Sequence, residues 1–259
     1  MINLQNLDIS ISKKKIVDNV NIDVDSGEFV GLIGPNGSGK STLLKATYRV
    51  LKKYGGTILI DGTDIRKETI HTSALKTAVV PQHSYSNFDF TVRDVVLMGR
   101  APHKKAMEFD NKEDYAIADE ALERVGMKEF SDRSFYTLSG GEQQRIVLAR
   151  AMAQKTKCMV LDEPTNHLDV KYQLQLMDIV KSLNITVLCA LHDLNIAGAY
   201  CDKLYLLKEG KIYCYGTPQE VLTAENILEV YGVHAVVTRS PNTGLLNVEY
   251  VPAHAKPIN

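Results

Sequence analysis

Apolar and polar residues alternate near the start of the chain. Every second residue is apolar over Leu7–Ile11 and again over Val20–Val24. A period of two is typical of a strand that turns one face to a core and the other to solvent. The pattern therefore predicts an antiparallel pair of strands within residues 1–30.

Further along the chain, apolar runs appear without alternation. They occupy residues 28–33, 158–161 and 185–191, and shorter strand patterns fall at 55–62 and 77–81. A continuous short apolar run is typical of a parallel strand that is buried on both faces. Helical patterns separate these runs, and alternating strands and helices predict a parallel α/β sheet.

From about residue 89 to 157 the pattern is mainly helical. Asn111 and Asp114 have the spacing of a capping box, and Gly126 ends the helix that follows. The sequence therefore predicts one domain over 1–259, with a helical insertion at about 89–157 and a C-terminal extension at about 233–259. In that extension, residues 235–238 and 245–251 predict a hairpin, and 253–259 a frayed tail.

Composition narrows the class of protein. The chain has 259 residues, 44% of them hydrophobic, and a formal net charge of −1, so no overall basic field favours nucleic acid. No apolar run approaches the roughly 20 residues that span a bilayer, and the N-terminus lacks the features of a signal peptide. Four cysteines without close pairing, Cys158, Cys189, Cys201 and Cys214, are expected to be free thiols in a reducing cytosol.

One glycine-rich stretch follows the first buried strand. It reads Gly34, Pro35, Asn36, Gly37, Ser38, Gly39, Lys40, Ser41 and Thr42. This fits the phosphate-loop template, in which glycines let backbone N–H groups surround a phosphate chain. Lys40 is then expected to reach the terminal phosphates, and the Ser41 hydroxyl to hold Mg²⁺. The order of strand, loop and helix over 28–51 agrees with the motif.

A second motif places two acids after a buried strand. Asp162 and Glu163 follow the run that begins at Cys158, at the end of a strand where α/β proteins bind ligands. Asp162 suits coordination of Mg²⁺, and Glu163 suits orientation or deprotonation of a water aimed at the γ-phosphorus. The alternative is an ordinary solvated turn, which the phosphate loop in the same chain disfavours.

A third motif, Leu138–Arg145, reads LSGGEQQR. Ser139 and Glu142 have capping-box spacing before an amphipathic helix, so one interpretation is simply a well-started helix. Gly140 and Gly141 suggest more, because glycine in a first helical turn lowers stability. They leave N–H groups facing outward, as a phosphate site requires.

Together these motifs resemble the nucleotide-binding subunit of an ATP-binding cassette (ABC) transporter, and the resemblance extends over residues 1 to about 232. It implies a phosphate-loop (P-loop) NTPase fold of RecA-like type. In that fold a mixed, largely parallel α/β sheet core carries an N-terminal antiparallel β subdomain and an inserted α-helical subdomain.

The resemblance also implies roles for particular residues. Residues 34–42 match the Walker A loop, 158–163 the Walker B strand with its catalytic glutamate, 138–145 the signature motif and 166–169 the D-loop. Gln82 matches the Q-loop glutamine that contacts Mg²⁺ or water, and His192 the histidine that reaches the γ-phosphate. Ser139, Gly140 and Gly141 are implied to touch ATP held by a second copy. Purely structural roles for Gln82 and His192 are the alternatives.

One position departs from the family pattern. The family usually carries an aromatic residue that stacks on adenine, where this chain has Ile11 or Ser12. Neither side chain can stack on a base, and stacking is worth about 1–3 kcal/mol. We therefore predict modest discrimination between ATP and GTP, below about a hundredfold.

The segment 90–103 ends in Gly-Arg-Ala-Pro-His and resembles the cassettes of iron–siderophore, haem and cobalamin importers that pair with FecCD-type permeases. Tyr231-Gly232-Val233 fits the same group. Another interpretation is a surface shaped for some other membrane partner and solute. The implied partners are a second copy, a dimeric membrane permease and, indirectly, a substrate-binding protein, and the implied place is the cytoplasmic face of the membrane. A soluble ABC ATPase is disfavoured by the single cassette, and an inactive regulatory module by the intact acid pair.

Overall fold

The computed structural model describes residues 1–82, 90–105, 107–166, 168–252 and 254. They form two compact units. The first unit consists of residues 1–64 and 186–259, and the second of residues 65–185. The single domain over 1–259 stays a prediction.

The first unit contains an antiparallel sheet at its N-terminal end. Its strands, in the order β2-β1-β4-β5, are β1 (Ile2–Ile11), β2 (Lys14–Val24), β4 (Gly55–Ile60) and β5 (Thr63–Asp64). The apolar residues of the alternating pattern are buried, with Leu7 and Val20 at 0% exposure. The predicted antiparallel pair is confirmed, with Ile2 opposite Val24.

A second set of strands in this unit runs mainly parallel. β3 (Phe29–Ile33) lies between β8 (Thr186–Ala190) and β9 (Lys203–Lys208), and β10 (Lys211–Gly216) pairs antiparallel with β9. Every residue of β3 and β8 is buried, as their unbroken apolar runs predict. The helices are α1 (Lys40–Thr47), α7 (Leu194–Tyr200), α8 (Pro218–Val221) and α9 (Ala224–Tyr231).

Two boundaries in the first unit test the sequence predictions. Helix α1 stops at Thr47 rather than near residue 51, because Arg49 has a left-handed φ of +66°. The predicted hairpin is confirmed as β11 (Ala235–Arg239) paired with β12 (Leu246–Tyr250), and α7 packs against β12. The tail predicted at 253–259 lies outside the described residues except for residue 254.

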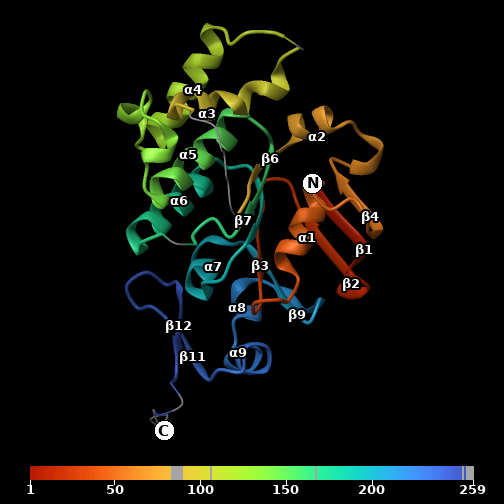
Figure 1. The fold of residues 1–259 in the computed structure, drawn as a ribbon. Coiled ribbons are helices and arrows are strands. Elements are labelled where there is room, and N and C mark those ends of the chain that lie inside the picture. The colour runs from red at the N-terminus through yellow and green to blue at the C-terminus, as the bar shows by residue number, and fades with distance from the viewer. Residues whose placement is uncertain (83–89, 106, 167, 253, 255–259) are drawn as a thin grey trace. The chain divides into compact units, whose positions relative to one another are not determined.

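The second unit places helices around two parallel strands, β6 (Thr77–Val80) and β7 (Cys158–Asp162). Its α-helices are α2 (Ile70–Lys76), α3 (Val92–Leu97), α4 (Lys112–Arg124), α5 (Gly140–Ala153) and α6 (Val170–Ser182). Short 3-10 helices are η1 (Ile65–Lys67), η2 (Met98–His103), η3 (Lys128–Phe130) and η4 (Phe135–Thr137). Helices α3, α4 and α5 pack on one another, which Figure 1 shows in yellow and green.

The helical character predicted for this stretch is confirmed. Between residues 90 and 157 the described residues form helices and one isolated bridge, Thr91 to Ser134. The capping box of α4 is also present, since the Asn111 side chain accepts from the Asp114 N–H at 3.1 Å and the Asp114 carboxylate accepts from the Asn111 N–H at 3.1 Å. Local cap chemistry thus fixes the start of this helix.

Two further expectations concern cysteines and membranes. None of the four cysteines forms a disulfide; Cys158, Cys189 and Cys201 are buried, and Cys214 is half-buried. Among the described residues, no helix combines the length and the apolar character that crossing a bilayer requires.

Candidate active site

The glycine-rich loop joins β3 to α1 in the first unit. Gly34, Gly37 and Gly39 have φ angles of +146°, +79° and +105°. A Cβ on Gly34 would lie 2.3 Å from the Leu207 carbonyl oxygen, and one on Gly39 would lie 3.0 Å from the Ile16 carbonyl oxygen. Glycine is therefore needed at both positions by conformation and by space.

Lys40 is the first residue of α1, and it is only 4% exposed. Its Nζ donates hydrogen bonds to the carbonyl oxygens of Gly34 at 2.7 Å and Pro35 at 3.2 Å. A buried ammonium group is costly unless it is hydrogen-bonded, so these carbonyls hold the side chain back over its own loop. The loop thus carries a positive charge as well as open backbone.

The beginning of α1 is chemically open. Its N-cap is Gly39, no side chain caps the first turn, and no acidic residue lies in that turn. The Ser38 hydroxyl is buried, at 2% residue exposure, and makes no hydrogen bond among the described residues. Bare first-turn amides, a buried hydroxyl and Lys40 are complementary to an anion. These residues therefore fit the polyphosphate of a nucleotide.

His192 belongs to the same unit and follows β8. β3 and β8 are parallel neighbours, with Leu32 opposite Ala190, and the Leu191 N–H donates to the Leu32 carbonyl at 2.9 Å. The chain therefore leaves for the phosphate loop and for His192 from the same edge of the sheet, the carboxyl ends of the strands. Half-buried His192 is brought to that edge, as the family pattern predicts.

In the second unit, Gln82 and Glu163 follow the parallel pair β6 and β7. Glu163 is 7% exposed, and its Oε2 accepts hydrogen bonds from the Gln82 side-chain amide and, at 2.6 Å, from the Asn166 side-chain amide. Asp162 is fully buried at the end of β7. The unit therefore brings together Gln82, Asp162 and Glu163, all three predicted from the sequence.

The backbone of Glu163 is strained, with a φ of +54°. A left-handed glutamate is uncommon and costs about 1 kcal/mol or more, and such strain often marks functional positions. The bond from Asn166 was missed at the sequence level, where this residue figured only as part of the D-loop. The one sequence signal for this hydrogen bond is that Asn166, with its side-chain amide, follows the acid Glu163 by three residues in a turn.

The signature segment starts α5. The Ser139 backbone N–H and hydroxyl both donate to Glu142 Oε2, at 2.8 and 2.7 Å, and the Glu142 N–H donates to the Ser139 hydroxyl at 3.4 Å. The hydrogen bond from the Ser139 hydroxyl, followed by that from its N–H, lowers the pKa of Glu142. The predicted capping box is confirmed.

Glycine at this helix start is not required for folding. A Cβ on exposed Gly140 would meet nothing within 4 Å, and one on Gly141 would lie 3.3 Å from Leu168 Cδ2. Since neither residue has a positive φ, the fold accepts alanine at Gly140 without strain. A functional reason for this glycine is consistent with the geometry.

The Gly-Arg-Ala-Pro-His segment has an internal role that the sequence did not show. A Cβ on Gly99 would lie 2.2 Å from the Arg150 carbonyl oxygen. Arg100 Nη1 donates to the Ala153 carbonyl at 2.8 Å, and His103 Nε2 is 2.7 Å from the Gln154 carbonyl oxygen. Basic side chains thus bind the last carbonyls of α5, where they also favour the helix dipole.

Arg100 is also part of a buried ionic group. Its Nε lies 3.0 Å from Asp114 Oδ1, and Lys104 Nζ lies 3.0 Å from Asp114 Oδ2. Burial alone would raise the pKa of Asp114, but the N–H of Asn111 and the two cations outweigh it and lower the pKa to about 2. Asp114 is therefore ionised throughout the physiological range.

The next feature is the turn after β1, where the family pattern predicts a ring that stacks on adenine. Ile11 ends β1 opposite Lys14 and is 44% exposed. Ser12 and Lys13 form the turn, with φ angles of +49° and +69°. Neither Ile11 nor Ser12, the two positions that could match the family's ring, carries an aromatic side chain.

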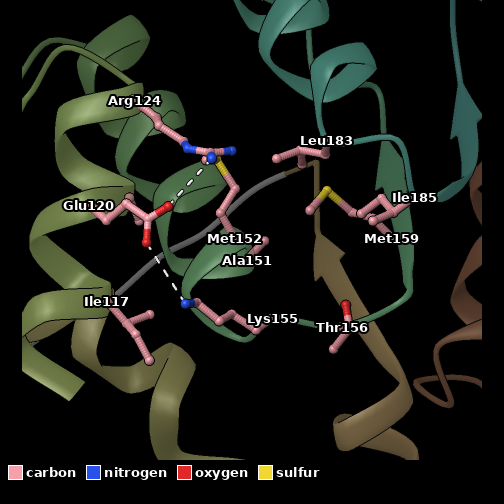
Figure 2. Close-up of a pocket in the computed structure, with 11 residues that line it drawn as sticks. Ile117, Glu120, Arg124, Ala151, Met152, Lys155, Thr156, Met159, Leu183 and Ile185 are labelled. Carbon is pink, nitrogen blue, oxygen red and sulfur yellow. Dashed lines mark ion pairs between the residues drawn. The ribbon is translucent and has the colours of Figure 1, made fainter. Parts of the chain in front are cut away.

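A separate pocket of about 210 Å³ lies in the second unit (Figure 2). Apolar side chains including Met152 and Met159 line it, and Glu120 at its rim pairs with Arg124 at 3.4 Å and Lys155 at 3.8 Å. These pairs are half exposed, and such pairs contribute at most about 1 kcal/mol. Among the described residues, its lining contains no predicted catalytic, nucleotide-binding or metal-binding residue.

The fold and these residues define an α/β nucleotide-binding protein of the phosphate-loop class. Comparison with known proteins makes this more specific. Residues 17–166, more than half of the chain, match the family described as ABC transporter. The chain belongs to the ABC transporter family, and the predicted fold class is confirmed.

Individual relatives and structures agree. The chain is 38% identical over 250 residues to the cobalamin import ATP-binding protein BtuD of Halobacterium salinarum, covering 95% of this chain and 62% of that protein. It is 40% identical to the petrobactin import ATP-binding protein FpuC of Bacillus anthracis, covering 90% of this chain and 87% of that one. A solved inward-facing ABC transporter, described as of the metal-chelate type, superposes with a TM-score of 0.83 at 28% identity, covering 98% and 97% of the two chains.

Proposed function

We propose that the protein is the ATP-hydrolysing subunit of an ABC importer. Two copies bind two Mg-ATP molecules and drive uptake of an iron chelate, haem or cobalamin through a membrane permease. The observation that carries the nucleotide part is the phosphate loop, with strained glycines and with Lys40 held inside it by two carbonyls.

Binding is assigned to the residues of the loop. Backbone N–H groups within residues 34–42, Pro35 excepted, donate to the phosphates, and Lys40 exchanges its carbonyl partners for phosphate oxygens. Ser41, Asp162 and Gln82 hold Mg²⁺. When bound, this ion neutralises charge on the triphosphate.

Hydrolysis is assigned to Glu163. Gln82 and Asn166 both donate to its Oε2, which orients the carboxylate. Glu163 accepts a proton from a water whose oxygen bonds to the γ-phosphorus, while the bond from that phosphorus to the β-phosphate oxygen breaks. His192 contacts the γ-phosphate and positions it.

The signature segment completes the assignment. Ser139, Gly140 and Gly141 contact the ATP of a second copy, so binding favours a closed dimer and hydrolysis releases it. ATP shifts this equilibrium only by its difference in affinity for the closed and open states. The dimer acts at the cytoplasmic face of the membrane, and a substrate-binding protein delivers the solute to the permease.

Support for the solute class comes from two relatives and one structure. The relatives are named for import of cobalamin and petrobactin, and the structure is of a metal-chelate type transporter. Uptake of radiolabelled ferric chelate, haem and cobalamin by cells with and without this gene tests the class. Loss of uptake of another solute alone would redirect the assignment.

Calorimetric titration with Mg-ATP tests the nucleotide site. The Lys40→Ala variant is expected to lose at least about a hundredfold in affinity, because a buried charge-assisted contact to phosphate disappears. Lys53→Ala, an exposed lysine beyond α1, is the matched control and should bind normally. Unchanged affinity of Lys40→Ala in the folded protein would remove the phosphate-loop assignment.

A second variant tests the role of Glu163 as the general base. Glu163→Gln is expected to bind Mg-ATP, to lower turnover by about a thousandfold or more, and to accumulate as a dimer. Single-turnover hydrolysis and light scattering measure these properties. Full residual turnover would contradict the role of Glu163.

A further inference from the structure

The start of α5 lies beside the segment that leads into α6 and beside the first turn of α6. A Cβ added to Gly141 would lie 3.3 Å from Leu168 Cδ2, so Leu168 lies beside the bare backbone of Gly141. Four residues after Gly141 and four after Leu168, the guanidinium carbon of Arg145 lies 4.8 Å from the centre of the Tyr172 ring. Gly141 and Arg145, four residues apart, share one face of α5, whereas Leu168 precedes α6 and Tyr172 lies in its first turn; we call these two neighbouring pairs the ladder.

Arg145 connects a third helix to this ladder. Its Nη1 donates to the carbonyl of Val125, the C-cap of α4, at 3.3 Å. Its Nε is buried and has no hydrogen-bond partner among the described residues. A desolvated guanidinium gains more from an aromatic face than an exposed one does, so the Tyr172 ring compensates Arg145 for its burial.

The ladder continues to the proposed base. The Gln173 side-chain amide, on α6, donates to the carbonyls of Leu168 at 3.0 Å and Thr165 at 3.3 Å. Asn166, between them in sequence, donates to Glu163 Oε2. The hydrogen bonds of Gln173 and Asn166 therefore connect the start of α6, where Tyr172 meets Arg145, to Leu168, Thr165 and Glu163, all within the second unit.

We propose that Arg145 and Tyr172 are positioning residues that lock the signature helix to the segment following Glu163. Rotation of α5 when Ser139–Gly141 receives a nucleotide is transmitted by the ladder to Asn166 and sets the orientation of Glu163. This inference rests on the proposed function. Its consequence is that the nucleotide of one copy aligns the base serving the other, so turnover is cooperative in ATP.

Four single variants separate this role from a purely structural one. Tyr172→Leu removes the aromatic face, and Arg145→Gln removes the cation. Tyr172→Phe keeps the face and is the conservative rescue. Lys171→Ala is the matched control, because Lys171 Nζ lies 5.6 Å from the same ring but reaches nothing on α5 in the described contacts.

Steady-state ATPase curves and nucleotide affinity at low protein concentration are the measurements. Tyr172→Leu and Arg145→Gln are expected to lower kcat about fivefold and to bring the Hill coefficient to about 1, with affinity within about twofold of wild type. Tyr172→Phe and Lys171→Ala should resemble wild type. The double variant should be no slower than either single one, because both remove the same contact.

Amide hydrogen exchange without nucleotide gives an independent measurement. The N–H groups of Asn166 and Leu168 donate to the carbonyls of Glu163 and Thr165. Tyr172→Leu is expected to speed their exchange about fivefold while β7 stays protected. Equal exchange in both proteins would overturn the lock.

The kinetic outcomes distinguish the two proposals. If wild type hydrolyses ATP cooperatively and the variants match it, the lock is wrong and the proposed function stands. Additive losses in the double variant also overturn the lock. If folded wild-type protein binds no Mg-ATP, both proposals fail.

Discussion

The phosphate loop and the signature segment both put glycines at the start of a helix, yet they are built in opposite ways. Helix α1 begins at left-handed Gly39 without any side-chain cap. Helix α5 begins with a complete capping box between Ser139 and Glu142. One helix start is left open, and the other is closed by its own side chains.

The roles of the glycines differ accordingly. Gly34 is required by the fold, since its Cβ would lie 2.3 Å from a backbone oxygen, whereas Gly140 faces open space. Substitution at the first site therefore mixes folding with function. Substitution at the second isolates function.

The largest effect is expected for Gly34→Ala. A side chain at φ +146° would collide with the Leu207 carbonyl, so nucleotide affinity should be lost and the free energy of unfolding should fall by about 3 kcal/mol. Titration with Mg-ATP and denaturant unfolding measure both. Gly37→Ala is the control for positive φ without a clash, and it should cost about 1 kcal/mol. Equal losses of unfolding free energy in Gly34→Ala and Gly37→Ala would refute the steric argument.

Gly140→Ala sharpens the contrast. Turnover is expected to fall about a hundredfold, because small displacements at a reacting site are costly. The free energy of unfolding should stay equal or rise by about 0.5–1 kcal/mol, since alanine is the better helix former. Nucleotide affinity at low protein concentration should not change. A large loss of stability would mean that the fold does require this glycine.

The C-terminal end of α5, the helix that begins with the signature segment, depends on Asp114 for its stability. Asp114→Asn should cost about 3 kcal/mol, because it weakens the partner of buried Arg100, which holds the Ala153 carbonyl. Asp132→Asn is the control, since Asp132 pairs with Arg93 while 88% exposed, and it should change stability by less than about 0.5 kcal/mol. Urea unfolding at neutral pH compares the two.

Lowering the pH should reproduce part of this loss of stability. The ordinary pKa of the Asp114 carboxyl is 3.8, and the fold lowers it to about 2. The corresponding stabilisation of about 2 kcal/mol is present above pH 4 and is lost as the pH falls toward 2. Unfolding of wild type and Asp114→Asn over this range should converge; parallel curves would contradict the assignment.

The smallest effect concerns recognition of the adenine base rather than of the phosphates. With Ile11 in place of a ring, the preference for ATP over GTP should stay below about a hundredfold, and Ile11→Tyr should raise ATP affinity about tenfold. Titrations with both nucleotides measure this. A wild-type preference above a hundredfold would show that another group reads the adenine.

Local chemistry explains what could be predicted from the sequence. The alternating strands, the caps at Asn111 and Ser139 and the phosphate loop each depend on residues a few positions apart. The hold of Arg100 on Ala153 and the Arg145–Tyr172 contact join residues 53 and 27 positions apart. Neither contact leaves a periodic signature, so only the structure reveals them. The early end of α1 was missed because nothing in its apolar spacing marks Arg49 as left-handed.

The left-handed backbone of Glu163 has an evolutionary consequence. Glycine and asparagine tolerate a φ of +54° far better than glutamate does, so drift toward greater robustness would tend to replace the acid at this position. A lineage that abandoned hydrolysis would be released from that conflict. Loss of this acid, with the phosphate loop retained, would therefore be an early mark of a descendant that binds nucleotide without consuming it.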